Sequence, residues 1–238
     1  LFSRLTSNYA TEKDFDKLMN RTCNRPLPSG RMSSGFVLLF SSLFLLIGSL
    51  SLLLTNSYLP MVLGLFNVLW YNLLYTWLKR KTPYAVIPGA LTGAIPVLIG
   101  WTAAGGGIFA PGVLILSGFV FFWQVPHFWL LILKYGKEYE QAGFASLTRH
   151  MTTEKLKQII LIWIVATSLY SFLLVRYGMI QSAPLLMVFI FTNVWLVITF
   201  YRLSLKKEDQ AVTYKGATVT INLFMLAVLI LVIMNGIL

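Results

Sequence analysis

The 238-residue sequence has little charge, few acidic residues and almost no cysteine. Charged residues make up 11% of the chain and hydrophobic residues 57%. This excludes an ordinary soluble domain, in which about a quarter of the residues are charged. Cys23 is the only cysteine, so neither an intrachain disulfide nor a site of several thiolates can form. The composition indicates an integral membrane protein.

The scarcity of acidic residues gives the chain a net charge of +11, from 19 basic and 8 acidic side chains. Such a charge can indicate nucleic-acid binding, but the sequence has no basic face interleaved with aromatic residues. Membrane proteins carry excess lysine and arginine in their cytoplasmic loops, and this explains the charge. We therefore expect no nucleic-acid partner.

What is present is a series of long apolar runs. Seven of them reach about 20 residues, enough to cross a bilayer, at roughly 34–54, 58–78, 84–104, 111–133, 157–176, 181–201 and 217–238. The predicted fold class is therefore all-α, a polytopic bundle of transmembrane helices, with residues 1–238 as one domain. The chain begins with leucine, and we expect the true N-terminus to be missing.

The loops between these spans predict an orientation. With the polar segment 8–31 inside, 18 of the 19 basic residues lie inside and only Arg176 lies outside. The inside loops are expected at 79–83, 134–157 and 202–215. All eight acidic residues fall on the same side. A carboxylate site therefore opens to the cytoplasm, or to the matrix in a mitochondrion, and the inner membrane of a bacterium is the expected location.

The polar segment before the first span carries candidate metal ligands. Asn8, Glu12 and Asp16 are four residues apart, so on a helix they share one face. Their oxygen atoms could hold a divalent cation between them.

Basic residues follow these oxygen ligands. Arg21 and Arg25 come before Pro26 and Pro28, which end regular helix and are expected to hold an extended turn. Hard oxygen ligands beside guanidinium groups suit a magnesium diphosphate, because arginine neutralises phosphate with bidentate hydrogen bonds. The alternative is a solvated loop whose charges orient the spans, and these residues alone leave both open.

A second polar cluster begins in the fourth span. Trp123, His127, Lys134 and Glu138 fall along one face of a helix running from the bilayer interior to its surface. Pro126 removes an N–H from this helix and so frees a carbonyl, which is common around cavities. His127 is either a hydrogen-bonded core residue or a ligand contact, and its depth in the membrane favours a function.

Two further features have plain structural explanations. Lys79, Arg80 and Lys81 form a basic cluster that is sufficiently explained as a topology anchor. Gly89 and Gly93 allow close contact between helices, and packing is their default role.

Taken together, the three clusters resemble one family, the protohaem IX farnesyltransferases (haem O synthases) of the UbiA-type intramembrane prenyltransferases. Its first motif, N-x-x-x-D-x-x-x-D, matches with Glu12 in the middle position. The other matches are M-x-R-T-x-x-R-P-L at 19–27, Y-T-x-x-L-K-R-x-T at 75–82 with one residue fewer, G-x-x-x-G-A-x-P at 89–96, W-Q-x-P-H-F at 123–128 and K-Y-x-x-x-Y-x-x-A-G at 134–143. A complete member is expected to have about nine helices, so one or two N-terminal helices would be absent here.

The resemblance implies a reaction and its participants. A farnesyl group passes from farnesyl diphosphate to a vinyl group of haem B, and water adds to give haem O. Mg²⁺ is the implied cofactor, the lipid bilayer is the surrounding medium, and a downstream haem A synthase is a further partner.

The resemblance also implies roles for single residues. Tyr135 and Tyr139 stand where the wider superfamily has aspartates, which leaves Glu138 as the nearest carboxylate there. The implied site residues are Asn8, Glu12 and Asp16 as catalytic groups and metal ligands, Glu138 as a further metal ligand, Tyr135 and Tyr139 as catalytic aromatic groups, Arg21, Arg25, Lys79, Arg80 and Lys134 as diphosphate-binding cations, and His127 against haem.

Three alternatives stay open. Another UbiA-type prenyltransferase could use a quinone or aromatic acceptor, although the M-x-R-T-x-x-R-P-L and W-Q-x-P-H-F matches weigh against it. A membrane transporter would move substrate without Mg²⁺ and without a product of altered mass. An inactive fragment is the third alternative, because the loss of two helices could open the bundle.

Overall fold

The computed structural model describes residues 16–18, 22–55, 57–141, 145, 147, 151–206 and 211–237, without the side chains of 137–139, 141, 211–213 and 237. Every regular element in these ranges is helical. The chain divides into two compact units, one made of Leu1–Ile108 with Tyr135–Arg149 and the other of Phe109–Lys134 with His150–Leu238. The predicted all-α class is confirmed for the described residues.

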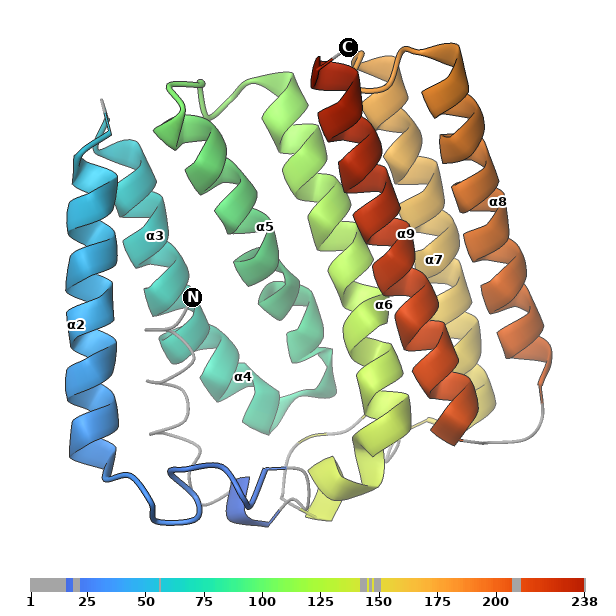
Figure 1. The fold of residues 1–238 in the computed structure, drawn as a ribbon. Coiled ribbons are helices and arrows are strands. Elements are labelled where there is room, and N and C mark those ends of the chain that lie inside the picture. Colours follow the sequence, from blue (N-terminus) through green and yellow to red (C-terminus); the bar gives the residue numbers. More distant parts are fainter. Residues whose placement is uncertain are drawn as a thin grey trace. The chain divides into compact units, whose positions relative to one another are not determined.

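The first unit contains the earlier helices (Figure 1). They are α2 (Ser34–Leu53), α3 (Leu59–Leu69), the π-helical turn η1 (Trp70–Tyr75), α4 (Thr76–Lys81), the 3₁₀ turn η2 (Pro83–Ala85) and α5 (Val86–Ala103). The elements α3, η1 and α4 follow one another without a break and form one membrane-spanning segment. At the end of η1, the backbone N–H of Thr76 donates to the carbonyl of Tyr71, five residues earlier, which is the π-helical spacing.

The second unit contains most of α6 (Pro111–Gln141), as far as Lys134, and three further helices. These are α7 (Thr153–Arg176), α8 (Ala183–Leu205) and α9 (Ala211–Ile237). Within this unit α7 packs against α8, and α8 packs against α9. Their succession can be followed by colour in Figure 1.

The seven predicted spans are confirmed within the described residues. Seven helical segments are long and apolar enough to cross a membrane, and they match the predicted runs to within a few residues. One boundary was wrong, because the inside loop expected from residue 134 begins as helix and α6 continues to Gln141. Lysine, glutamate and glutamine favour helix, and no proline interrupts this stretch.

The outer surfaces of the helices are apolar. Leu39 and Phe191 are each 70% exposed, and Ile162 is 66% exposed. Extended apolar surface of this kind is unfavourable in water and suits contact with lipid chains. The protein is therefore an integral membrane protein.

A proline inside α5 removes one helical hydrogen bond, and a side chain of α3 replaces it. Pro96 has no backbone N–H, so the carbonyl of Thr92, four residues earlier, loses its donor within the helix. The side-chain amide of Asn67 in α3 donates to that carbonyl at 3.1 Å. Both Asn67 and Thr92 are buried. The missing helical bond is thus replaced by one that joins α3 to α5.

The second unit solves the same problem in α6. Pro126 leaves the carbonyl of Phe122 without its helical donor, yet the helix continues through it. The hydroxyl of Thr167 in α7 lies 3.1 Å from this carbonyl and 2.7 Å from the Trp163 carbonyl of its own helix. Its single proton is shared between these two acceptors.

A buried polar cluster joins α7 to α8. The hydroxyl of Ser168 donates to Oδ1 of Asn193 at 2.8 Å, and Nδ2 of Asn193 donates to the Phe189 carbonyl at 2.9 Å. The hydroxyl of Ser171 shares its proton between the Ser168 carbonyl at 2.7 Å and Oδ1 of Asn193 at 3.0 Å. All three polar side chains are buried. In lipid, interhelical hydrogen bonds of this kind contribute to helix association.

The bond between Asn67 and Thr92 can be tested with a double-mutant cycle. We expect Asn67→Leu to be destabilising in the native chain, because it leaves the Thr92 carbonyl buried without a donor. In a Pro96→Ala background the helix regains its own N–H, and the same change should cost less. The expected coupling is about 0.5–1.5 kcal/mol, measured from denaturant unfolding in detergent. Equal costs in both backgrounds would contradict the assignment.

Candidate functional site

The segment before α2 holds one predicted metal ligand, a buried aspartate, in an ion pair with a partly exposed arginine. Asp16 is 4% exposed, and its Oδ2 lies 3.2 Å from Nη1 of Arg25. The hydroxyl of Thr22, which is fully buried, donates to the Asp16 backbone carbonyl at 2.8 Å. Thr22 and Arg25 both belong to the M-x-R-T-x-x-R-P-L motif. Two residues of this motif therefore hold Asp16 in position.

The chain between Thr22 and Gly30 is compact, and the predicted extended turn is wrong. The backbone N–H of Arg25 donates to the backbone carbonyl of Thr22, and the backbone N–H of Ser29 donates to the backbone carbonyl of Arg25, each at 3.0 Å. Gly30 has a φ of +78°, a conformation that glycine adopts without strain. Proline fixes φ near −65°, which is also the value required in the middle of a tight turn. The prolines therefore permit folded turns as readily as an extended chain.

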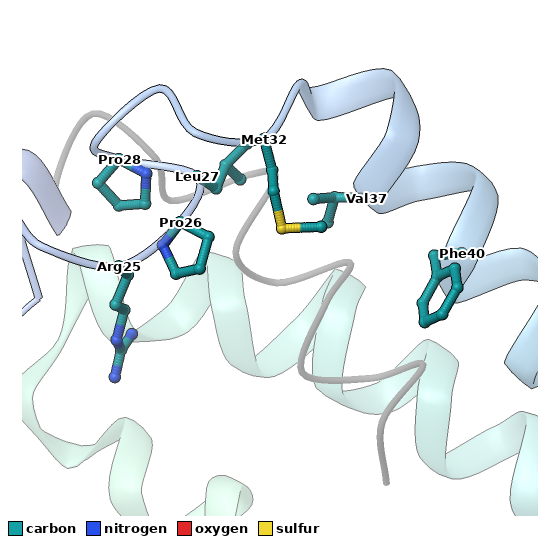
Figure 2. A pocket seen from close by; sticks show the side chains of 7 residues that line it. All are labelled: Arg25, Pro26, Leu27, Pro28, Met32, Val37 and Phe40. Atoms are coloured by element: carbon teal, nitrogen blue, oxygen red, sulfur yellow. The ribbon is translucent and has the colours of Figure 1, made fainter.

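An apolar pocket lies beside Arg25 (Figure 2). Its volume is about 230 Å³, and it is lined by Arg25, Pro26, Leu27, Pro28, Met32, Val37 and Phe40. Figure 2 shows the Arg25 guanidinium directed away from the apolar side chains. Arg25 therefore joins a buried carboxylate on one side to an apolar surface on the other.

The basic cluster after η1 lies at the same end of the first unit. Nζ of Lys79 lies 5.4 Å from the centroid of the Tyr75 ring, within the range of a cation–π contact. A Cβ on Gly89 would lie 2.5 Å from Cε2 of Tyr75, so this glycine makes room for the ring. Figure 1 shows the end of α4, the 22–33 segment and the last residues of α6 at one end of this unit. Arg80 is exposed there.

His127 lies in a polar and aromatic cluster of the second unit. The Trp123 and His127 rings stack with their centroids 4.9 Å apart, and Nε1 of Trp123 donates to the Ile221 carbonyl at 2.8 Å. The Asn222 side chain in α9 hydrogen-bonds the His127 side chain. Both helices therefore fix the position of the imidazole.

Three buried polar atoms near His127 have no hydrogen-bond partner among the described residues. They are Nδ1 of His127, Oε1 of Gln124 and Nε1 of Trp129. Buried polar atoms are normally paired, so each of these atoms is a position where a bound molecule or water could complete the bonding. His127 was expected to be either a hydrogen-bonded core residue or a ligand contact. It is hydrogen-bonded to Asn222, and its Nδ1 has no partner among the described residues, so it is compatible with both roles.

Sequence reasoning missed Asn222. It is exposed although it lies within an apolar span, and it contacts the one histidine of the membrane-spanning segments. An asparagine inside an apolar run is itself a signal, because a polar side chain in lipid needs a partner.

Several predicted site residues lie outside the described part of the chain. Asn8, Glu12 and Arg21 are among them, as are the side chains of Glu138 and Tyr139. Their roles remain predictions. Lys134 belongs to the second unit and Tyr135 to the first.

Asp16 fits a magnesium site by its chemistry. Among the described residues, no three histidine, cysteine or acidic side chains gather into a metal site. Asp16 nevertheless offers hard carboxylate oxygens in a buried position, and the Arg25 contact uses only Oδ2. It could therefore contribute its other oxygen to a cation.

Comparison with known proteins decides the family. The model of the UbiA prenyltransferase family matches residues 3–227. The chain belongs to this family. The resemblance drawn from the motifs is thereby confirmed at the family level.

Two curated relatives of this UbiA-family chain carry the name protoheme IX farnesyltransferase. The protein from Geobacter sulfurreducens is 41% identical over 144 residues, which is 59% of this chain and 52% of the relative. The protein from Christiangramia forsetii is 37% identical over 208 residues, 86% of this chain and 68% of the relative. The chain thus spans between half and about two thirds of the length of these relatives.

The fold is also shared with a solved structure, a UbiA homologue from Aeropyrum pernix. The TM-score is 0.73, with 99% of this chain and 84% of the other covered, at 18% identity. At this identity the likeness concerns the fold alone.

The Thr22 bond to Asp16 is testable without an activity assay. Thr22→Val keeps the shape of the side chain and removes the donor, which leaves a buried carbonyl unpaired at a cost of about 1–3 kcal/mol. We expect amide exchange in residues 22–30 to accelerate about 5- to 100-fold, measured by hydrogen exchange with mass spectrometry. Ser29→Ala removes an exposed hydroxyl that bonds the Pro26 carbonyl at 3.3 Å, and it should change exchange little. Equal effects from the two variants would argue against a special role for Thr22.

Proposed function

We propose that this UbiA-family chain carries the activity of a protohaem IX farnesyltransferase, which makes haem O from haem B and farnesyl diphosphate. The observation that carries the proposal is the ion pair between the buried Asp16, from the first motif of the superfamily, and Arg25, from the M-x-R-T-x-x-R-P-L motif of the haem O synthases. The names of the relatives at 41% and 37% identity support the same reaction.

The reaction places a definite demand on the protein. The bond between C1 of farnesyl and the diphosphate oxygen breaks, and its electron pair leaves with diphosphate. A new carbon–carbon bond forms to the vinyl group, and water adds to the resulting cation with loss of a proton. Negative charge develops on the diphosphate as the bond breaks, and this charge makes the largest contribution to the activation barrier. The main requirement is therefore a set of fixed cations around the diphosphate.

The first unit supplies such cations. Arg25, Lys79 and Arg80 lie toward one end of it, and in this proposal Arg21 and Lys134 complete the diphosphate site. Mg²⁺ bound by Asn8, Glu12 and Asp16, with Glu138 as a further ligand, would supply charge neutralisation at the phosphate oxygens. Asp16 holds Arg25 by one Nη, which fixes the position of the guanidinium. The apolar pocket beside Arg25 matches a ligand that joins a charged head to an apolar chain.

Aromatic groups serve the carbon skeleton in this proposal. The faces of Tyr135 and Tyr139 favour an allylic cation electrostatically, and the apolar helices keep water from it until the new bond has formed. His127 contacts haem. Its unpartnered Nδ1 and its stacking on Trp123 suit a flat aromatic ligand with polar edges, and Asn222 keeps the imidazole in one orientation.

The cellular setting is part of the same proposal. Residues 1–238 act as one transmembrane domain in the inner membrane of a bacterium, with the diphosphate site on the cytoplasmic side. The bias of 18 basic residues to one side supports this orientation. Haem O would then pass to a haem A synthase.

Asp16→Asn tests the proposed site with little change of shape. In membranes containing the complete protein, incubated with farnesyl diphosphate, haem B and Mg²⁺, we expect haem O formation to fall at least about 100-fold. The product is measured by mass spectrometry. Glu154→Gln, which neutralises an exposed carboxylate in the first turn of α7, should leave the rate unchanged.

The same assay separates the alternatives. A prenylated quinone or aromatic acid in place of haem O would indicate the sibling activity, and substrate flux with no product of altered mass would indicate a transporter. Unchanged turnover in Asp16→Asn would remove Asp16 from the site.

His127→Phe tests the contact with haem. The ring shape and the stacking on Trp123 are kept, while both ring nitrogens are lost. We expect KM for haem B to rise about 10-fold, the cost of one hydrogen bond in a buried site. KM for farnesyl diphosphate should stay the same. A rise in both constants would instead indicate a structural role in α6.

A further inference from the structure

A groove runs between α8 and α9 in the second unit. Its first part has a volume of about 480 Å³ and is lined by Thr199, Arg202, Leu203, Lys206, Gly216, Ala217 and Thr220. Its second part has a volume of about 440 Å³ and is lined by Phe191, Thr192, Trp195, Leu223, Leu226, Ala227 and Ile230.

The two parts follow each other along the same pair of helix faces. Trp195 and Thr199 are four residues apart on α8, and Thr220 and Leu223 are three apart on α9. Residues at these spacings are neighbours on one face of a helix. Since α8 and α9 pack against each other, the two hollows lie one after the other along this helix pair, and together they make up the groove.

The chemistry of the groove changes along its length. One end has the exposed cations Arg202 and Lys206 with the hydroxyls of Thr199 and Thr220, and the other end is almost wholly apolar. None of the described lining residues is acidic. The groove is therefore amphipathic, with a positive end and an apolar body.

The length of the groove matches one leaflet of a bilayer. Phe191 and Lys206 are 15 residues apart, which corresponds to about 22 Å along an α-helix. A leaflet with its head groups is about 20–22 Å thick. A molecule that lies in the groove with its charged head at Lys206 would end near the middle of the membrane.

The basic end of the groove is attached to the neighbouring helices, and it contains a glycine where a side chain would occupy space. The buried Nζ of Lys157 in α7 donates to the Lys206 backbone carbonyl at 3.0 Å and lies 5.8 Å from the Tyr214 ring centroid. This ties the end of α8 to the adjacent helices. A Cβ on Gly216 would meet no atom within 4 Å, so the absence of a side chain there leaves space in the groove.

We propose that this groove binds an anionic phospholipid. The phosphate lies between Arg202 and Lys206, and an acyl chain follows the apolar part past Trp195 and Ala227. Two cations, with no carboxylate among the described lining residues, favour a net negative head group over a zwitterionic one, because each cation near a membrane surface tightens the binding of anionic lipid about 5-fold. None of the lining residues is among those proposed for prenyl transfer.

The experiment measures lipid retention by the purified complete protein in a nonionic detergent, using native mass spectrometry. The probes are phosphatidylglycerol and phosphatidylcholine with identical oleoyl chains. We expect phosphatidylglycerol to bind at least about 10-fold more tightly, and Arg202→Gln/Lys206→Gln to weaken its binding about 10- to 30-fold. The matched control is Arg176→Gln, an exposed arginine in the last turn of α7, which should leave binding unchanged.

A second variant tests the apolar part of the groove without altering charge. Ala227→Trp fills the space for the chain and should weaken both lipids, and a thermal unfolding scan confirms that each variant is folded. Equal affinity for the two lipids would overturn the proposal, as would an equal loss in Arg176→Gln. Displacement of phosphatidylglycerol by farnesyl diphosphate at equimolar concentration would make this a prenyl diphosphate site instead. Loss of a dimer in Ala227→Trp would make it an interface between two copies.

Discussion

The structure depends on one constraint. A backbone carbonyl inside the bilayer has no water to hydrogen-bond with, so it must accept a hydrogen bond from a protein donor. Two prolines create such carbonyls. In the first unit Asn67 bonds the carbonyl that Pro96 leaves unpaired, and in the second Thr167 does so for Pro126. In both cases the donor comes from another helix and lies outside the motif that contains the proline. The motif prolines are therefore also points of attachment between helices.

The same constraint gives meaning to the few polar side chains in an apolar protein. Asp16 is buried and paired with Arg25, and Asn222 is bonded to His127. A polar group at such a position is stabilised only by a partner or by a ligand. Four buried side-chain atoms have no hydrogen-bond partner among the described residues, on Asn67, Gln124, His127 and Trp129, and a bound molecule that paired with one of them would gain a hydrogen bond.

The sequence was a sufficient guide to the spans, because length and hydropathy alone determine which helices can cross a bilayer. It also grouped Asp16 with Arg25 on chemical grounds, and the structure pairs them. Contacts between distant residues could not be predicted. Thr167 lies 45 residues from Phe122, and nothing local to either residue indicates the bond. The course of the chain at Pro26 and Pro28 was mistaken because a proline φ suits extended and turn conformations alike.

The π-helical turn Trp70–Tyr75 has a consequence for how relatives of this protein should be aligned. A π turn accommodates one residue more than an α turn, and each residue advances an α-helix by about 100°. Side chains beyond Tyr75, including Lys79, thus point in a direction that an uninterrupted α-helix would not give them. Two homologues that differ by one residue here would have the same hydropathy profile and the same spans. Their basic clusters would nevertheless face different neighbours, so gap placement in this turn decides which lysine corresponds to which.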